Sequence, residues 1–198
     1  MRKILFSLFF LTLFLPACTP SDFLTRRLAA DLIAASSTFR AALELHVHTG
    51  IVSNNDYSSP ESTAFQHHGW ITATHAVCPP EIAPPPCWAL TLTPAGVETI
   101  QSLIPPNDAT KNSFDILAAR RELIAVTGIS KQGNTAEVEF TWHWNPLNEV
   151  GASVYRSDLR YRSIAPFRRF DDGWRISRGM SHPAQSFDDS LKSAEPAQ

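Results

Sequence analysis

A run of strict alternation near the middle of the chain constrains the fold most. Between Ala136 and Trp144, apolar residues occupy every second position and mostly polar residues fill the places between them. Side chains of a β-strand point alternately to its two faces, so this pattern predicts a strand with one buried face. An apolar, partly β-branched run at 123–129 and a turn-like segment at 130–134 precede it. The sequence therefore predicts an antiparallel hairpin in the middle of a sheet.

Further extended segments are expected around this hairpin. Residues 155–170 are followed by a tight turn at 171–173 and a short run at 174–177, which together predict a closing hairpin. Residues 65–77 and 88–92 have the composition of two earlier strands.

Two helices are expected before and between these strands. Apolar residues recur at steps of three and four through 22–46, with charged residues on the other side, which predicts a long amphipathic helix packed on the sheet. The same apolar stripe could face lipid, but its polar side is not strongly basic. Thr93 and Pro94 predict the start of a shorter helix that Pro105 and Pro106 end.

A long helix followed by hairpins able to curl around it resembles the cystatin-like or NTF2-like α+β architecture. The Asp-Asp-Gly-Trp-Arg-Ile sequence at 171–176 is similar to the last hairpin of many such domains. The resemblance implies that the N-terminal helix and the second short helix pack on a curved antiparallel sheet built from hairpins. It indicates no activity, because this fold carries enzymes, binding modules and assembly factors alike.

The N-terminus has the parts of an export signal. A short positive start is followed by an uncharged apolar run at 4–14, which is too short to span a bilayer. The Leu15-Pro16-Ala17-Cys18 sequence comes directly afterwards and resembles the lipobox of bacterial lipoproteins. The resemblance implies that residues 1–17 are removed and that Cys18 carries fatty acids such as palmitate.

Lipidation of Cys18 would fix the location of the protein. Residues 18–21 would form a tether between the acyl chains and the folded part. Thr19, rather than Asp, follows the cysteine, which by analogy with enterobacterial sorting implies the outer membrane, facing the periplasm. The alternative is an ordinary signal peptide with a free Cys18, but Leu15 is large where such cleavage sites need a small residue.

One domain is expected, over 22–182, because a chain of this length can bury a single good core. Residues 183–198 show no periodicity, which predicts a disordered tail.

The two remaining cysteines, Cys78 and Cys87, form an even pair in an oxidising compartment, which predicts a disulfide. The eight residues between them include five prolines. The alternative is two unpaired buried thiols. A zinc site would need further cysteine or histidine ligands nearby.

The charge of the chain limits the classes of partner that it can bind. Without residues 1–17 the chain has 15 basic and 19 acidic residues, so we expect no nucleic-acid partner. The 155–178 segment nevertheless contains seven arginines and three aspartates. Four of the arginines before the turn at 171–173 occupy even-numbered positions, so on one strand they would point to the same face: Arg156, Arg160, Arg162 and Arg168. Such a face could bind the anionic groups of lipopolysaccharide, phospholipid headgroups or an acidic envelope protein. The alternative is a solvated face paired with Glu137 and Glu139.

Seven histidines invite a metal interpretation. His46 and His48 would share a face on a strand but would diverge on a helix, whereas His67 and His68 would point apart on a strand. No acidic residue completes a known ligand spacing, so neither a metal nor another cofactor is predicted.

A catalytic pocket is the alternative to a binding role. In NTF2-like enzymes the cone between helix and sheet holds polar groups, and the candidates here are His143, Asp158 and Tyr155. His143 alternates with Trp142 and Trp144, so it should face away from the core if they face inward. No nucleophile elbow, phosphate loop or paired-carboxylate spacing is present. The leading expectation is a lipid-anchored cell-envelope protein that binds or assembles; the alternative is a periplasmic enzyme with a cone-shaped pocket.

Overall fold

The computed structural model describes residues 23–82, 85–104, 112–177, 186–194 and 196. The proposed signal peptide, Cys18 and its tether, and Pro105 and Pro106 lie outside the described residues.

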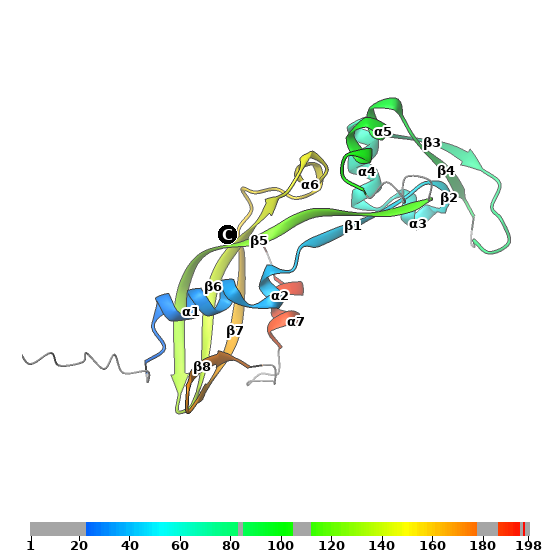
Figure 1. Ribbon diagram of the computed structural model, residues 1–198. Helices are drawn as coiled ribbons and strands as arrows, with labels where there is room; N and C mark the ends of the chain where they lie inside the picture. The colour runs from blue at the N-terminus through cyan, green and yellow to red at the C-terminus, as the bar shows by residue number, and fades with distance from the viewer. Residues whose placement is uncertain (1–22, 83–84, 105–111, 178–185, 195, 197–198) are drawn as a thin grey trace, which may run out of the picture.

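The protein has an α+β fold with two antiparallel sheets that lie end to end (Figure 1). The larger sheet has the order β1-β5-β6-β7-β8 and the smaller one the order β2-β4-β3. The strands are β1 (Leu43–His48), β2 (Gly50–Ser53), β3 (Ile71–Ala76), β4 (Cys87–Leu92), β5 (Ser113–Gln132), β6 (Thr135–Pro146), β7 (Tyr161–Phe170) and β8 (Gly173–Ile176). The helices are α1 (Arg26–Ala35), α2 (Ser37–Arg40), α3 (Asn54–Tyr57), α4 (Pro60–His67), α5 (Pro94–Gln101), α6 (Glu149–Val154) and α7 (Phe187–Lys192).

The expected central hairpin is confirmed as β5 and β6. Gln132 pairs with Thr135 across a two-residue turn, in which Gly133 has a φ of +59° that favours glycine. Alternate residues of β6 are buried: Ala136, Val138, Phe140, Trp142 and Trp144. The closing hairpin is also confirmed, because Phe170 pairs with Gly173 between β7 and β8.

α1 lies in the concave face of the curled larger sheet (Figure 1). The Thr25 hydroxyl caps its first turn by accepting from the Leu28 amide at 3.1 Å. Ala29 and Ile33 are fully buried against the sheet. In α2, the Phe39 ring meets the Phe140 ring edge-on, with 6.0 Å between centroids.

The expected single helix over 22–46 is wrong beyond Ala35. Ser36 adopts an extended backbone conformation, ends α1 and caps the short α2 through the Phe39 amide. The chain then forms β1, which pairs with β5 and buries Leu45 and Val47. Pairing with β5 therefore overrides the helical preference of this alanine- and leucine-containing segment.

We call β2, β3, β4 and the helices α3, α4 and α5 the small lobe. Here the expected strand at 65–77 is shorter than predicted, because α4 occupies its beginning and β3 starts at Ile71. The expected helix after Thr93 is confirmed as α5, but it packs against β4 and α6 rather than on the larger sheet. The small lobe has a hydrophobic core of its own, centred on Phe65, Trp70, Leu90 and Ile100.

β5 connects the two parts of the molecule. Its first residues pair with β1 and contribute Phe114 and Ile116 to the core of the small lobe. Its last residues form the hairpin with β6. Two register shifts lie within the β5–β6 pairing, at Leu123/Ala125 and Val126/Gly128. Such bulges bend a strand and increase its twist, which accounts for the curl of the sheet.

The tail expected to be disordered from residue 183 contains α7. Phe187 and Leu191 are buried beside β7, and the Ser190 hydroxyl accepts from the Ile164 amide at 2.8 Å. The prediction was therefore wrong for this segment, because two apolar residues at helical spacing complete the core of the larger sheet.

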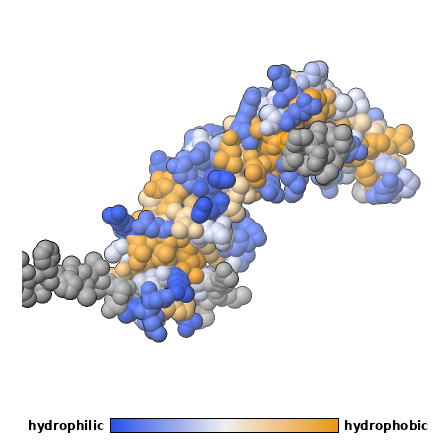
Figure 2. Space-filling model, viewed as in Figure 1, coloured by the Kyte–Doolittle hydropathy of each residue, from blue (hydrophilic) through white to orange (hydrophobic). Residues whose placement is uncertain are grey.

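The predicted disulfide is confirmed: Cys78 and Cys87 are bonded, with their Cα atoms 5.2 Å apart. It ties the chain leaving β3 to the start of β4. Among the described residues, no helix has both the length and the apolar character needed to cross a bilayer. Figure 2 shows hydrophobic and hydrophilic patches over both the larger sheet and the small lobe.

Candidate functional site

The concave face of the larger sheet is filled with aromatic rings. Trp142 stacks on Tyr161 with 4.7 Å between ring centroids, and Trp144 packs against Tyr155 at 5.4 Å. Trp142 also donates a buried hydrogen bond from Nε1 to the Ser163 hydroxyl at 3.0 Å. The space between α1 and the larger sheet is therefore occupied by core side chains.

Arg121 projects a charged group into this aromatic cluster. Its guanidinium carbon lies 4.8 Å from the Trp144 ring centroid and 5.5 Å from that of Trp142. Nη1 donates to the Thr38 carbonyl at 3.2 Å, whereas the buried Nε has no hydrogen-bond partner. Burial lowers the pKa of Arg121, and the Asp188 carboxylate partly opposes this shift.

A hollow of about 310 Å³ lies beside Arg121 and is also lined by Thr38, Leu43 and Asp188. The Trp142 and Trp144 rings cover the guanidinium, and the Asp188 carboxylate is paired with Lys192 at 2.6 Å. The charged groups around this hollow therefore already have partners within the protein.

The three candidate catalytic residues lie in three different environments. His143 faces away from the core, as predicted, with Nδ1 2.9 Å from the Ser157 carbonyl oxygen and Nε2 3.4 Å from Glu122. Asp158 is exposed and accepts two hydrogen bonds from Arg156, at 2.6 and 3.0 Å, which lowers the pKa of Asp158. Tyr155 packs inside, and burial, assisted by Glu61 and Tyr161, raises its pKa to about 12. In the part of the chain that the structure describes, none of the three lines the hollow beside Arg121 or the pockets at the small lobe.

The four arginines do not form one sheet face. Arg162 and Arg168 belong to β7 and are exposed on its outer side. Arg156 and Arg160 precede β7, in the connection from α6, and Arg156 is paired with Asp158. Their shared parity was misleading because the connection is not part of the sheet.

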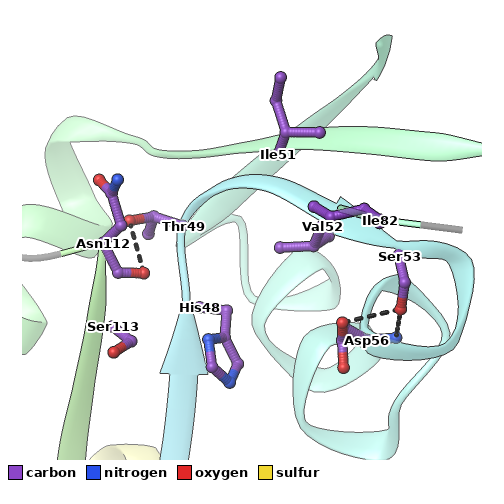
Figure 3. A pocket seen from close by; sticks show the side chains of 9 residues that line it. All are labelled: His48, Thr49, Ile51, Val52, Ser53, Asp56, Ile82, Asn112 and Ser113. Carbon is purple, nitrogen blue, oxygen red and sulfur yellow. Dashed lines mark hydrogen bonds between the residues drawn. The ribbon is translucent and has the colours of Figure 1, made fainter. Parts of the chain in front are cut away.

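An open pocket of about 610 Å³ lies at the corner where β1 passes into β2 (Figure 3). Gly50 makes this corner with a φ of +82°, a conformation that side chains with a Cβ rarely adopt. The polar lining comes from His48, Thr49, Ser53, Asp56, Asn112 and Ser113, and the apolar lining from Ile51, Val52 and Ile82. We call it the corner pocket.

Hydrogen bonds hold the frame of the corner pocket in place. The Thr49 amide donates to the Asn112 carbonyl at 2.8 Å, which ties the end of β1 to the start of β5. The Ser53 hydroxyl donates to Asp56 Oδ2 at 2.7 Å and accepts from the Asp56 amide at 3.2 Å. This arrangement is a helix cap for α3, so Asp56 has a structural role as well as a place in the lining.

His48, Ser113 and Asp56 invite comparison with a catalytic triad. His48 and Ser113 are opposite each other in the β1–β5 register, and Figure 3 places the imidazole between the other two side chains. However, among the described residues His48 donates no hydrogen bond to Asp56 and accepts none from Ser113, and Ser53 occupies Oδ2 of Asp56. A nucleophile and base normally lie within hydrogen-bond reach, so the arrangement is that of a polar binding surface.

The histidines do not converge on a metal site. Because β1 is a strand, His46 and His48 share its exposed face, and His46 Nδ1 is hydrogen-bonded to Asp115. Within the part of the chain that the structure describes, no three His, Cys, Asp or Glu side chains lie close enough to hold a metal ion.

The corner pocket was not anticipated from the sequence. Its polar residues lie at strand ends and in short connections, where such residues are common and form no motif. One signal was visible: Lys and Arg are absent from 41–104, whereas this stretch contains five acidic residues. The small-lobe side of the pocket is therefore acidic, whereas Lys111 directly precedes Asn112 on the β5 side.

No protein-family model matches this chain, and no curated protein and no solved structure matches it either. The function therefore has to be inferred from the sequence and the geometry.

Proposed function

We propose that this protein is a lipid-anchored binding module of the cell envelope whose binding site is the corner pocket. The anchor is Cys18, which is acylated after removal of residues 1–17 and holds the protein at the outer membrane, facing the periplasm. What supports the anchor is the lipobox-like Leu15-Pro16-Ala17-Cys18 sequence behind an apolar run of eleven residues.

A cystatin- or NTF2-like classification is part of the proposal. What supports it is an N-terminal helix, α1, held in the concave face of a sheet built from hairpins. The small lobe inserted between β1 and β5 is a departure from the simple form of that architecture.

A binding role is favoured over catalysis by the filling of the concave face. Trp142 and Phe140 are essentially inaccessible, so the cone has no room for a substrate beside them. The corner pocket instead offers hydroxyl, amide and carboxylate groups next to three aliphatic side chains. Such a mixture suits recognition of a polar group with an apolar neighbour.

The charge around the corner pocket indicates the class of ligand. Asp56 lines it, Glu61 and Glu81 lie in the same lobe, and no Lys or Arg occurs between 41 and 104. The Asp56 carboxylate in the lining would repel an anion, so we propose an uncharged or positively charged partner group. An envelope protein that presents such a group is the expected partner.

The observation that most supports a binding role is that the corner pocket lies at one end of β5, far from the end near the proposed anchor. Ser113 at the first residue of β5 lines the pocket, and Gln132 is the last residue of the same strand. At about 3.3 Å per residue the strand path between them is about 60 Å. Phe23, the first described residue, lies beside the Gln132 end, where Lys131 Nζ is 5.7 Å from its ring centroid. An anchor five residues before Phe23 would therefore leave the pocket exposed to partners.

Site-specific photocrosslinking in intact cells tests this function. A photoreactive residue at Ile51, which lines the pocket and is 45% exposed, is compared with one at Ile164, which is 39% exposed on the outer face of β7. We expect a discrete adduct from position 51 alone. Ser113→Trp should fill the pocket and abolish the adduct, whereas Ser130→Trp, at the other end of β5, should not. Identical adducts from both positions, or an adduct unaffected by Ser113→Trp, would contradict the proposal.

A further inference from the structure

Three segments of the chain meet at the end of the larger sheet opposite the small lobe (Figure 1). They are residues 23–30 at the start of α1, residues 130–136 around the β5–β6 turn and residues 167–176 around the β7–β8 turn, and we call them together the hairpin end. The Arg169 amide donates to the Asn134 carbonyl at 2.8 Å, which joins the two turns. Arg26 Nη2 donates to the Thr127 carbonyl at 3.3 Å, which fixes the start of α1 beside them.

The hairpin end is basic. Its three segments contain six basic residues and two acidic ones, a net charge of +4: Arg26, Arg27, Lys131, Arg168, Arg169 and Arg175 against Asp171 and Asp172. Asp172 is paired with Arg175. Residues 41–104, which include the whole small lobe, contain five acidic residues and no Lys or Arg. The molecule is therefore an electric dipole that lies along β5.

Two exposed aromatic rings accompany these cations. Phe23 is 63% exposed and Phe170 is 45% exposed. Lys131 Nζ lies 5.7 Å from the Phe23 ring centroid, and the guanidinium carbons of Arg168 and Arg175 lie 5.7 and 5.5 Å from that of Phe170. Aromatic rings beside Lys and Arg are typical of surfaces that rest at the headgroup level of a bilayer.

The N-terminal chain brings this end close to the anchor. Phe23 follows Cys18 by five residues, and a chain extends by no more than about 3.6 Å per residue. A lipidated Cys18 would therefore keep Phe23 within about 18 Å of the bilayer surface. Because Lys131 Nζ lies 5.7 Å from the Phe23 ring centroid, the β5–β6 turn would be held close to the bilayer as well.

We infer that the hairpin end docks on anionic phospholipid headgroups and stands the molecule upright on the membrane. This inference rests on the proposed lipid anchor. The anionic surface attracts the basic end and repels the acidic small lobe, so both charges favour one orientation. Each Lys or Arg near such a surface changes the partition by about fivefold. The corner pocket is thereby directed away from the bilayer.

Amide hydrogen exchange of the full lipidated chain in vesicles tests the orientation. One set of vesicles is phosphatidylcholine alone, and the other contains equal parts of phosphatidylcholine and phosphatidylglycerol. We expect slower exchange at 132–134 and 171–173 in the anionic vesicles only, with no change in the small lobe. Raising the salt toward 1 M should remove the protection, because the screening length falls to about 3 Å.

Matched variants separate docking from folding. The double variant Arg168→Gln and Arg175→Gln removes two charges at the hairpin end and should lose the protection in anionic vesicles. Arg162→Gln, an exposed arginine on the same strand about 20 Å from Arg168 along β7, should keep it. Co-flotation of each variant with the vesicles reports the anchor separately, and all should float.

Equal exchange at the turns in both kinds of vesicle, with the chain still floating, would overturn the docking inference and leave the anchor intact. Protection that appears only when an acidic envelope protein is added would overturn it too, in favour of a protein partner. A chain that fails to float would refute the anchor instead.

Discussion

The guanidinium group of Arg121 lies over the ring of Trp144, with 4.8 Å between its central carbon and the ring centroid. We expect the charge to contribute little net stability, because its Nε is buried without a partner and, within the described part of the chain, only Nη1 donates a hydrogen bond, to the Thr38 carbonyl. An unsatisfied buried polar atom costs about 1–3 kcal/mol, which offsets a cation–π contact of about 0.5–2 kcal/mol. We therefore predict that Arg121→Met changes the free energy of unfolding by less than about 1 kcal/mol, measured by urea denaturation.

Trp142→Ala, in the same aromatic cluster, is the variant with which the stability of Arg121→Met is compared. Its ring is 1% exposed, and loss of a buried aromatic side chain costs about 3–5 kcal/mol. If Arg121→Met costs as much as Trp142→Ala, the charge has a role that the aromatic filling does not explain.

Gly151 brings α6 into direct contact with β5. A Cβ atom at this position would lie 1.9 Å from the Ala118 carbonyl oxygen, so Gly151→Ala must push the helix off the strand. We expect a loss of about 2 kcal/mol or more in thermal or urea unfolding.

Gly128→Ala is the matched control within β5. The nearest atom to its added Cβ is Oε2 of Glu139 at 3.3 Å, the end of a flexible side chain that can move. We expect a change within about 1 kcal/mol. Equal losses for the two variants would show that α6 is not tightly seated on β5.

The Cys78–Cys87 disulfide closes a loop of ten residues in the small lobe. The chain-entropy model gives it about 2.5–3 kcal/mol, and less if the proline-rich loop is already stiff when unfolded. We predict that the double variant Cys78→Ser and Cys87→Ser lowers the midpoint of urea unfolding and that a reductant lowers the wild-type midpoint equally. A wild-type midpoint that does not respond to reductant in denaturant would show that the thiols are not paired.

The raised pKa of Tyr155 predicts a pH dependence of stability. Burial, with help from Glu61 and Tyr161, raises this pKa to about 12. A tyrosine in an unfolded chain has a pKa of about 10. The folded protein holds the proton more tightly, and the resulting stabilisation is complete below about pH 10 and is lost as the pH rises toward 12.

Tyr155→Phe should reduce the fall in stability over that interval of pH, measured by urea unfolding at a series of pH values. Tyr57→Phe changes a phenol in the small lobe and should leave the fall in place. An unchanged pH dependence in Tyr155→Phe would contradict the burial argument.

Local signals predicted the elements whose partners are near in sequence. The alternation along β6 and the Gly133 turn define their hairpin without any distant contact, and the Thr93 cap places α5 correctly. By contrast, the start of β1 could not be read from its sequence. Ala41 to Glu44 favours a helix, and only pairing with residues some seventy positions later turns it into a strand.

Two missed helices had signals that could have revealed them. Ser59 caps the start of α4, and Pro60 occupies its first helical position. Ser186 accepts from the Asp189 amide at the start of α7, which is the spacing of a capping motif. The corner pocket had no comparable signal, because its lining comes from three separate segments, 48–56, 82 and 112–113, that only the fold brings together.

The most direct test of the account is metabolic labelling of the full chain with radioactive palmitate. We predict that the label enters the wild-type protein, that Cys18→Ser abolishes it, and that the labelled chain fractionates with the outer membrane. A wild-type chain that takes up no label and fractionates with cytosolic markers would contradict the anchor, the envelope location and the upright orientation together.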